Sequence, residues 1–105
     1  KVSAGAVEYV PVARVNNISQ AMLDLKKQGV WVVGIDAEGK SDYTNVDFKL
    51  PTAIVIGAEG QGLSDLVKKR CDLVARIPMR GKITSLNASV AAALAMYEAF
   101  RQRGW

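Results

Sequence analysis

The sequence predicts an α/β fold in which helices flank a parallel sheet, and three features support this prediction. Residues 30–35 (VWVVGI) and 52–56 (TAIVI) are short, nearly continuous apolar runs, as expected for strands buried on both faces. An amphipathic segment precedes the first run and a long alanine-rich segment closes the chain, so strands and helices alternate. The second run leads directly into a glycine-rich loop, where such sheets usually bind ligands.

The first two predicted elements are a strand and a helix. Residues 7–15 alternate weakly in polarity and include Pro11, which suits a strand that begins irregularly or lies at an edge. Residues 18–28 predict a helix, because Asn17 can cap its start and Gly29 can end it. The buried strand at residues 30–35 follows directly.

The middle of the chain predicts an irregular segment and then strand, helix and strand. Residues 36–50 are polar and contain glycine, so we expect a loop or an irregular excursion. The buried strand at 52–56 follows, and Ser64 can cap a short helix that ends at Arg70. Residues 73–77 form the last predicted strand.

A long helix is predicted over residues 85–103, after a loop at 78–82, and Gly104 ends it. We expect one apolar stripe of this helix to face a core, consisting of Leu86, Val90, Leu94 and Tyr97. Other faces of the helix are thin enough for close packing because they carry Ala88, Ala91, Ala92, Ala93 and Ala95.

Size and composition limit the function. A chain of 105 residues forms at most one domain, and its start at Lys1 without methionine predicts a fragment of a longer protein. Its apolar runs fall far short of the ~18 residues that span a membrane, so we expect a soluble protein. The single cysteine, Cys71, predicts a cytoplasmic protein and a buried structural thiol. The absence of histidine excludes Ser-His, Cys-His and His-metal chemistry.

The net charge is +4, and basic residues concentrate in the last third of the chain. This distribution favours a polyanionic partner, RNA or DNA, although an ordinary solvated surface explains it equally well. The residues are Lys68, Lys69, Arg70, Arg76, Arg80, Lys82, Arg101 and Arg103.

The loop GAEGQG at residues 57–62 is the first candidate binding segment. It matches neither the dinucleotide fingerprint nor a Walker loop, no lysine follows it, and Glu59 lies where a phosphate would sit. Its glycines permit tight turns and let the backbone approach a ligand that need not be anionic. The alternative is a tight turn from strand to helix without a ligand.

The second candidate segment is TSLN at residues 84–87, which opens the long helix. Thr84 or Ser85 can simply be its N-cap. Asn87 is harder to explain structurally, because an amide in the first turn of an apolar helix offers both a donor and an acceptor to a substrate.

Together, IVIGAEGQGL at residues 54–63 and IPMRGKITSLNASVAAAL at 77–94 resemble motifs two and three of the SpoU (TrmH) family. These proteins are RNA ribose 2′-O-methyltransferases of the SPOUT superfamily. KVSAGAVEYVPV at the start and RCDLVARIPM at 70–79 also resemble the family, especially the branch that methylates a guanosine of large-subunit ribosomal RNA. The resemblance covers essentially the whole chain.

The resemblance implies an α/β knot, in which the C-terminal segment threads through a loop to form a deep trefoil. S-adenosylmethionine would lie in that knot without a metal ion. The family's pattern implies that the cofactor is contacted, largely through the backbone, by Gly57, Gly62, Ile77, Pro78, Met79 and Leu86.

The resemblance also implies three catalytic residues. Asn87 would orient the target ribose or the methionine part of the cofactor, Ser85 would add a hydrogen bond, and Glu59 would hold the loop and site arginines. The family's first motif, with an asparagine and an arginine, would precede Lys1. We therefore expect residues 1–105 to be the C-terminal portion of the methyltransferase domain, weak or inactive by itself.

The implied partners are RNA, in the first place large-subunit ribosomal RNA, and a second copy of the chain bound through the C-terminal helix. No membrane and no metal is expected. Three alternatives remain open: tRNA as substrate, a non-catalytic RNA-binding module of the same fold, and a different nucleotide-binding α/β domain.

Overall fold

The computed structural model describes residues 18–57, 62–78 and 88–104, and the predicted strand at 7–15 and the cap at Asn17 lie outside these ranges. Four parallel strands form one sheet in the order β2-β4-β1-β3. The strands are β1 (Trp31–Ile35), β2 (Ser41–Asp42), β3 (Thr52–Ile56) and β4 (Leu73–Arg76). The helices are α1 (Ile18–Lys27), α2 (Asp65–Arg70) and α3 (Ala88–Gln102), with a 3₁₀ turn η2 (Tyr43–Asn45) after β2.

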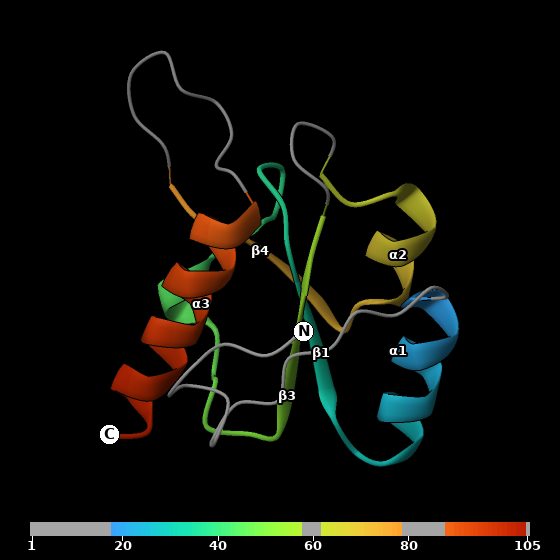
Figure 1. Ribbon diagram of the computed structural model, residues 1–105, viewed down its shortest axis with the longest axis horizontal. Helices are drawn as coiled ribbons and strands as arrows, with labels where there is room; N and C mark the ends of the chain where they lie inside the picture. Colours follow the sequence, from blue (N-terminus) through green and yellow to red (C-terminus); the bar gives the residue numbers. More distant parts are fainter. Residues whose placement is uncertain (1–17, 58–61, 79–87, 105) are drawn as a thin grey trace.

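Helices cover both faces of the sheet, with α1 and α2 on one side and α3 on the other (Figure 1). The predicted α/β fold with a parallel sheet between helices is confirmed. No helix within the described ranges is long and apolar enough to cross a membrane.

The central strand β1 contributes to both halves of the core, because its side chains alternate between the two faces. Val32 lies under α1 and α2, in a cluster with Met22, Val55, Leu63 and Val67. Val33 lies under α3, in a cluster with Ile35, Val46, Phe48, Ala75, Ala91 and Ala95. The predicted burial of this strand on both faces is confirmed.

The segment between β1 and β3 is more than the loop expected from its polar composition. It contains β2 and η2, and it places Val46 and Phe48 in the core under α3. Phe48 is completely buried. Isolated apolar residues in a polar stretch have no periodicity, so the sequence pattern does not reveal that they reach the core.

The predicted core-facing stripe of the long helix is wrong at Val90 and Tyr97, while Leu94 is half-buried. Val90 is 45% exposed and Tyr97 is 60% exposed. Ala91, Ala95 and Glu98, each one position further along, face the core instead. Alanine lets the helix lie close to the sheet, so the larger apolar side chains lie on the outer side.

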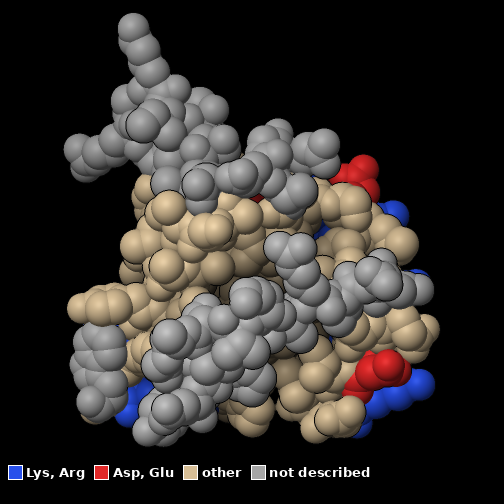
Figure 2. All heavy atoms as spheres, viewed as in Figure 1, with Lys and Arg blue, Asp and Glu red and all other residues tan. Residues whose placement is uncertain are grey.

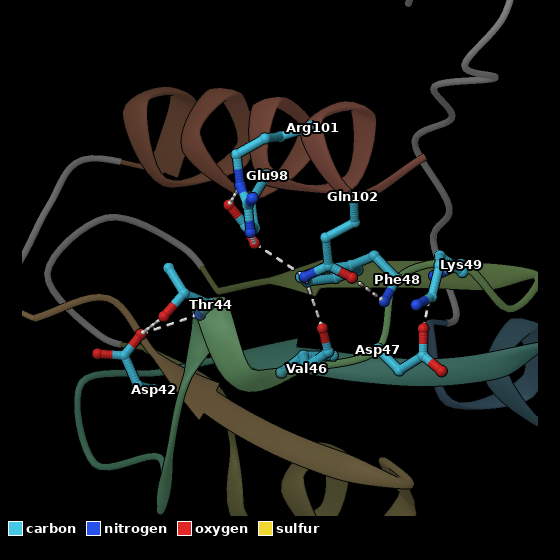
Figure 3. Close-up of polar contacts among 9 residues, drawn as sticks. All are labelled: Asp42, Thr44, Val46, Asp47, Phe48, Lys49, Glu98, Arg101 and Gln102. Atoms are coloured by element: carbon cyan, nitrogen blue, oxygen red, sulfur yellow. Dashed lines mark hydrogen bonds and ion pairs between the residues drawn. The ribbon is translucent and has the colours of Figure 1, made fainter. Parts of the chain in front are cut away.

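A polar network fixes the C-terminal half of α3 against the segment after η2 (Figure 3). The Gln102 amide donates to the Val46 carbonyl at 2.7 Å and accepts from the Phe48 N–H at 2.8 Å. Its amide nitrogen also donates to Glu98, whose buried carboxylate accepts two hydrogen bonds from the Arg101 guanidinium. The hydrogen bonds from Arg101 and the one from Gln102 outweigh the effect of burial, which raises the pKa of Glu98, so this pKa lies below its ordinary value.

Candidate functional site at the carboxyl edge of the sheet

Three adjacent strands end at one edge of the sheet. Ile35 at the end of β1 pairs with Ile56 of β3 and with Ala75 of β4, because the strands run parallel and in register. Asp36, Gly57 and Ile77 therefore follow strands that end side by side. A crevice at the carboxyl ends of a sheet covered on both faces is the usual ligand site of such folds.

The two ends of the glycine-rich loop meet directly. A Cβ atom added to Gly57 would lie 2.2 Å from the carbonyl carbon of Gly62, so no side chain fits there. Gly62 has a φ of +70°, in the left-handed region that glycine adopts without strain. Glu59, between these glycines, lies outside the described residues.

Asp36 holds the loop exit, by which we mean Gly62 and Leu63. Its carboxylate is buried and accepts the Leu63 N–H through Oδ2 at 2.9 Å. The other oxygen, Oδ1, accepts the Glu38 N–H, also at 2.9 Å. Burial raises the pKa of Asp36, but these two N–H donors and the Lys68 ammonium outweigh it, so the pKa lies below its ordinary value.

Lys68 of α2 lies beside this carboxylate. Its Nζ atom is 3.8 Å from Oδ1 of Asp36 and 3.4 Å from Oε1 of Glu38. The predicted cap of α2 is confirmed, because the Ser64 hydroxyl accepts the Val67 N–H at 3.2 Å. The helix that follows the loop exit is thus fixed at its start by Ser64 and tied to the end of β1 by Lys68.

The second candidate segment, residues 84–87, lies outside the described residues, and the structure describes Ile77 and Pro78 before it. Ile77 is half-buried against the core under α3, and Pro78 after it is exposed. Met79, Ser85, Leu86 and Asn87 lie outside the described residues. Of the predicted site residues, the structure brings Gly57 and Gly62 into contact and sets Ile77 and Pro78 at the same edge of the sheet.

Asp36 was not among the residues singled out by sequence, and Lys68 was named only as one of the basic residues near the end of the chain. The available signal was a charged residue directly after a buried strand, at the edge where ligands bind. Cys71 is partly buried against Gly34, and burial raises the pKa of its thiol, as expected for a structural cysteine. Within residues 18–57, 62–78 and 88–104, no three His, Cys, Asp or Glu side chains are grouped to hold a metal ion.

Charged side chains of both signs lie together beside α1 and α2, at the right margin of the view in Figure 2. Among the described residues, ion pairs join Lys26 of α1 to Asp72 and Lys68 of α2 to Asp36 and Glu38. Lys68 is the member of the basic cluster named from the sequence that these pairs neutralise.

Comparison with known proteins identifies the family. Residues 1–97 match the model of the SpoU rRNA Methylase family. The chain is 52% identical over 103 residues to YacO of Bacillus subtilis strain 168, which is assigned to the TrmH family of tRNA/rRNA methyltransferases. That alignment covers 98% of this chain but 41% of YacO, so the chain spans about two fifths of the length of this relative.

Solved structures share the fold. One is the SpoU methyltransferase AviRb from Streptomyces viridochromogenes in complex with AdoMet, with a TM-score of 0.79 and 36% identity over 94% of this chain and 41% of that one. Another is an RNA 2′-O ribose methyltransferase, with a TM-score of 0.76 and 34% identity over 83% of this chain and 34% of that one. The sequence motifs, the parallel sheet with its closed glycine loop and the family match agree, and the chain belongs to the SpoU rRNA methylase family.

Proposed function

We propose that this chain is part of an enzyme that transfers a methyl group from S-adenosylmethionine to a ribose 2′-hydroxyl of RNA, with ribosomal RNA as the substrate. The observation that carries the proposal is the direct contact of Gly57 with Gly62 at the carboxyl edge of the sheet, in a chain of this family. This contact makes the loop a backbone-lined surface without side chains at its two ends.

The described residues fit a cationic sulfonium ligand. A polyphosphate would need unpaired cationic groups or a loop with free N–H donors, but Lys68 at this edge is engaged by Asp36 and Glu38. The buried charged group next to the loop exit is the Asp36 carboxylate, and because Lys68 pairs with it, this part of the described structure offers an anionic ligand no excess positive charge.

We assign cofactor contacts to Gly57, Gly62, Ile77 and Pro78 at this edge, and to Met79 and Leu86 outside the described residues. Bound there, S-adenosylmethionine supplies an activated methyl group. A bond forms from the ribose 2′-oxygen to the methyl carbon, the bond from that carbon to sulfur breaks with its electron pair on sulfur, and the hydroxyl proton leaves to solvent. The backbone cradle contributes by holding the two reactants in line.

Asn87, Ser85 and Glu59 keep their proposed roles. Asn87 orients the ribose or the methionine part of the cofactor, Ser85 adds a hydrogen bond, and Glu59 holds the loop and site arginines. The trefoil knot belongs to the same proposal, with residues 1–105 as the C-terminal portion of the knotted domain. Because the chain spans 41% of its relative YacO, we expect the isolated chain to be weak or inactive in methyl transfer.

A homodimer through α3 is the proposed assembly. Ala91 and Ala95 face the sheet, so these two alanines are not part of the contact surface, whereas Ala93 is exposed. The exposed side chains of Val90 and Tyr97 offer apolar area to a second copy instead.

The first test is calorimetric titration of the 105-residue chain with S-adenosylhomocysteine, the product of the reaction. We expect one saturable site, abolished by Gly57→Ala because the added Cβ would overlap the Gly62 backbone. Gly29→Ala is the control, since Gly29 has a φ of +82° and open space around it, so this substitution strains the backbone away from the loop. Equal binding by wild type and Gly57→Ala contradicts the proposed site.

RNA specificity needs a separate assay. The full-length protein is incubated with tritiated S-adenosylmethionine and either ribosomal RNA or tRNA transcripts, and 2′-O-methylation is read from resistance of the modified linkage to alkali. Ribosomal RNA is expected to be labelled. Labelling of tRNA alone would replace the proposed substrate, and RNA binding without binding of S-adenosylhomocysteine would favour a non-catalytic module. Binding of ATP or NAD in place of S-adenosylhomocysteine would favour a different nucleotide-binding domain.

A further inference from the structure

We propose that Asp36 is a positioning residue that holds the loop exit in the conformation that binds the cofactor. The inference rests on the proposed function, because it assigns a role to a residue at the same site. Asp36 follows the central strand β1, and its own N–H continues the ladder to β4 by donating to Ala75 at 2.9 Å. The sheet therefore fixes the backbone of Asp36, and the hydrogen bond of its side chain to Leu63 holds the loop exit relative to the sheet.

Two backbone N–H groups donate to the Asp36 carboxylate at the same time. Leu63, 27 residues later in the chain, donates its N–H to Oδ2, while Glu38 donates to Oδ1. Leu63 is itself buried against α1 and α2, so the loop exit is held from the core side by packing and from the β1 side by Asp36.

Close contacts extend this position to the start of the loop. A Cβ atom on Gly62 would lie 2.6 Å from Oδ2 of Asp36, so the carboxylate occupies the space beside Gly62. Gly62 in turn lies against Gly57, where a Cβ atom would meet its carbonyl carbon. A shift of Asp36 thus moves Gly62, and Gly62 lies against the glycine that we assign to the cofactor.

Lys68 places a positive charge beside this carboxylate. The ammonium lies 3.8 Å from Oδ1 and comes from α2, which begins directly after the loop exit. An anionic carboxylate accepts both N–H groups, whereas a neutral amide in its place has one oxygen and must turn its NH₂ toward one of the two donors.

Asp72 provides a matched control within the same sheet. Its carboxylate also accepts a backbone N–H, from Val32 at 2.8 Å, and also lies near a lysine, Lys26, at 3.7 Å. Val32 lies near the amino end of β1, whereas Asp36 follows the carboxyl end of that strand. Removing either carboxylate is expected to lower stability, but only Asp36 contacts the loop exit.

The experiment is titration of wild type, Asp36→Asn, Asp36→Ala and Asp72→Ala with S-adenosylhomocysteine, at a temperature where circular dichroism shows each variant folded. We expect Asp36→Ala to weaken binding by about tenfold or more, Asp36→Asn to weaken it less, and Asp72→Ala to bind as wild type. Hydrogen exchange of the Leu63 amide should be faster in Asp36→Asn than in wild type and unchanged in Asp72→Ala. That readout stands even where Asp36→Ala does not fold.

The outcomes separate the two proposals. Wild-type binding that both Asp36 variants retain overturns the positioning role and leaves the cofactor site standing. Equal loss in Asp72→Ala also overturns it, because the effect is then one of general stability. Absence of binding in wild type overturns the proposed function, and the role of Asp36 falls with it.

Discussion

At the scale of single residues, the site depends on two glycines that have no side chain and on the carboxylate of Asp36. Gly57 and Gly62 are required by the atoms that surround them, since a Cβ on either would overlap backbone or the Asp36 carboxylate. Asp36 is required by two N–H donors that only an anion accepts together. These identities reflect contacts between distant parts of the chain.

The lowered pKa of Asp36 predicts how the stability of the protein depends on pH. Because its pKa is lower in the folded protein than the ordinary value of about 3.9, its contribution to stability is full above that value and is lost as pH falls through the folded-state pKa. The free energy of unfolding should therefore differ between wild type and Asp36→Asn near neutral pH, and this difference should shrink below about pH 4.

Urea unfolding of both proteins across this pH range measures that difference. Lys68 and Glu38 face Asp36, and Lys68 stays protonated throughout. The pKa of Glu98 is also lowered, but Glu98 contributes equally to the stability of both proteins, so its contribution cancels in the difference. A difference that grows on acidification would contradict this account.

At the scale of elements, α3 is fixed by side chains at its C-terminal end. Gln102 bonds the backbone of Val46 and Phe48, and the Arg103 guanidinium donates to the carbonyl of Phe48 at 2.8 Å. This anchoring brings Phe48 under the alanine face of the helix. It also explains why the irregular segment after η2 belongs to the core.

Replacing Gln102 with leucine should lower the free energy of unfolding by about 1–3 kcal/mol, because the Val46 carbonyl and the Phe48 N–H lose their partner. Gln28→Leu, at an exposed position after α1, is the control and should change stability by less than about 0.5 kcal/mol. Chemical denaturation monitored by circular dichroism compares them. Equal effects of the two substitutions would mean that the network contributes nothing specific.

At the scale of the whole molecule, three strand ends and the helix after the glycine loop define one edge, and α3 presents exposed apolar side chains on its outer side. A second copy is the partner proposed for that side.

Sedimentation velocity tests the assembly at micromolar concentration. We expect a dimer for wild type and a monomer for Tyr97→Glu, because a charge on the 60% exposed Tyr97 would be buried unpaired in the interface. Leu66→Glu changes a similarly exposed apolar residue of α2 and should leave the dimer intact. A monomeric wild type, or a dimer in both variants, would exclude this interface.

The sequence by itself determined the order of the described elements apart from β2 and η2, the parallel sheet and the cap at Ser64, because continuous apolar runs and capping residues are local signals. It also placed Gly57 and Pro78 directly after predicted strands, because the strands at 52–56 and 73–77 end there.

Only the tertiary structure decided which face of α3 is buried, that Phe48 completes the core, and that Asp36 holds the loop exit. When a helix has apolar residues on several faces, the face that packs most closely against the sheet is the one that is buried. In α3 that face carries Ala91 and Ala95. Asp36 and Leu63 meet because β1 and β3 end side by side, and that pairing exists only once the chain has folded.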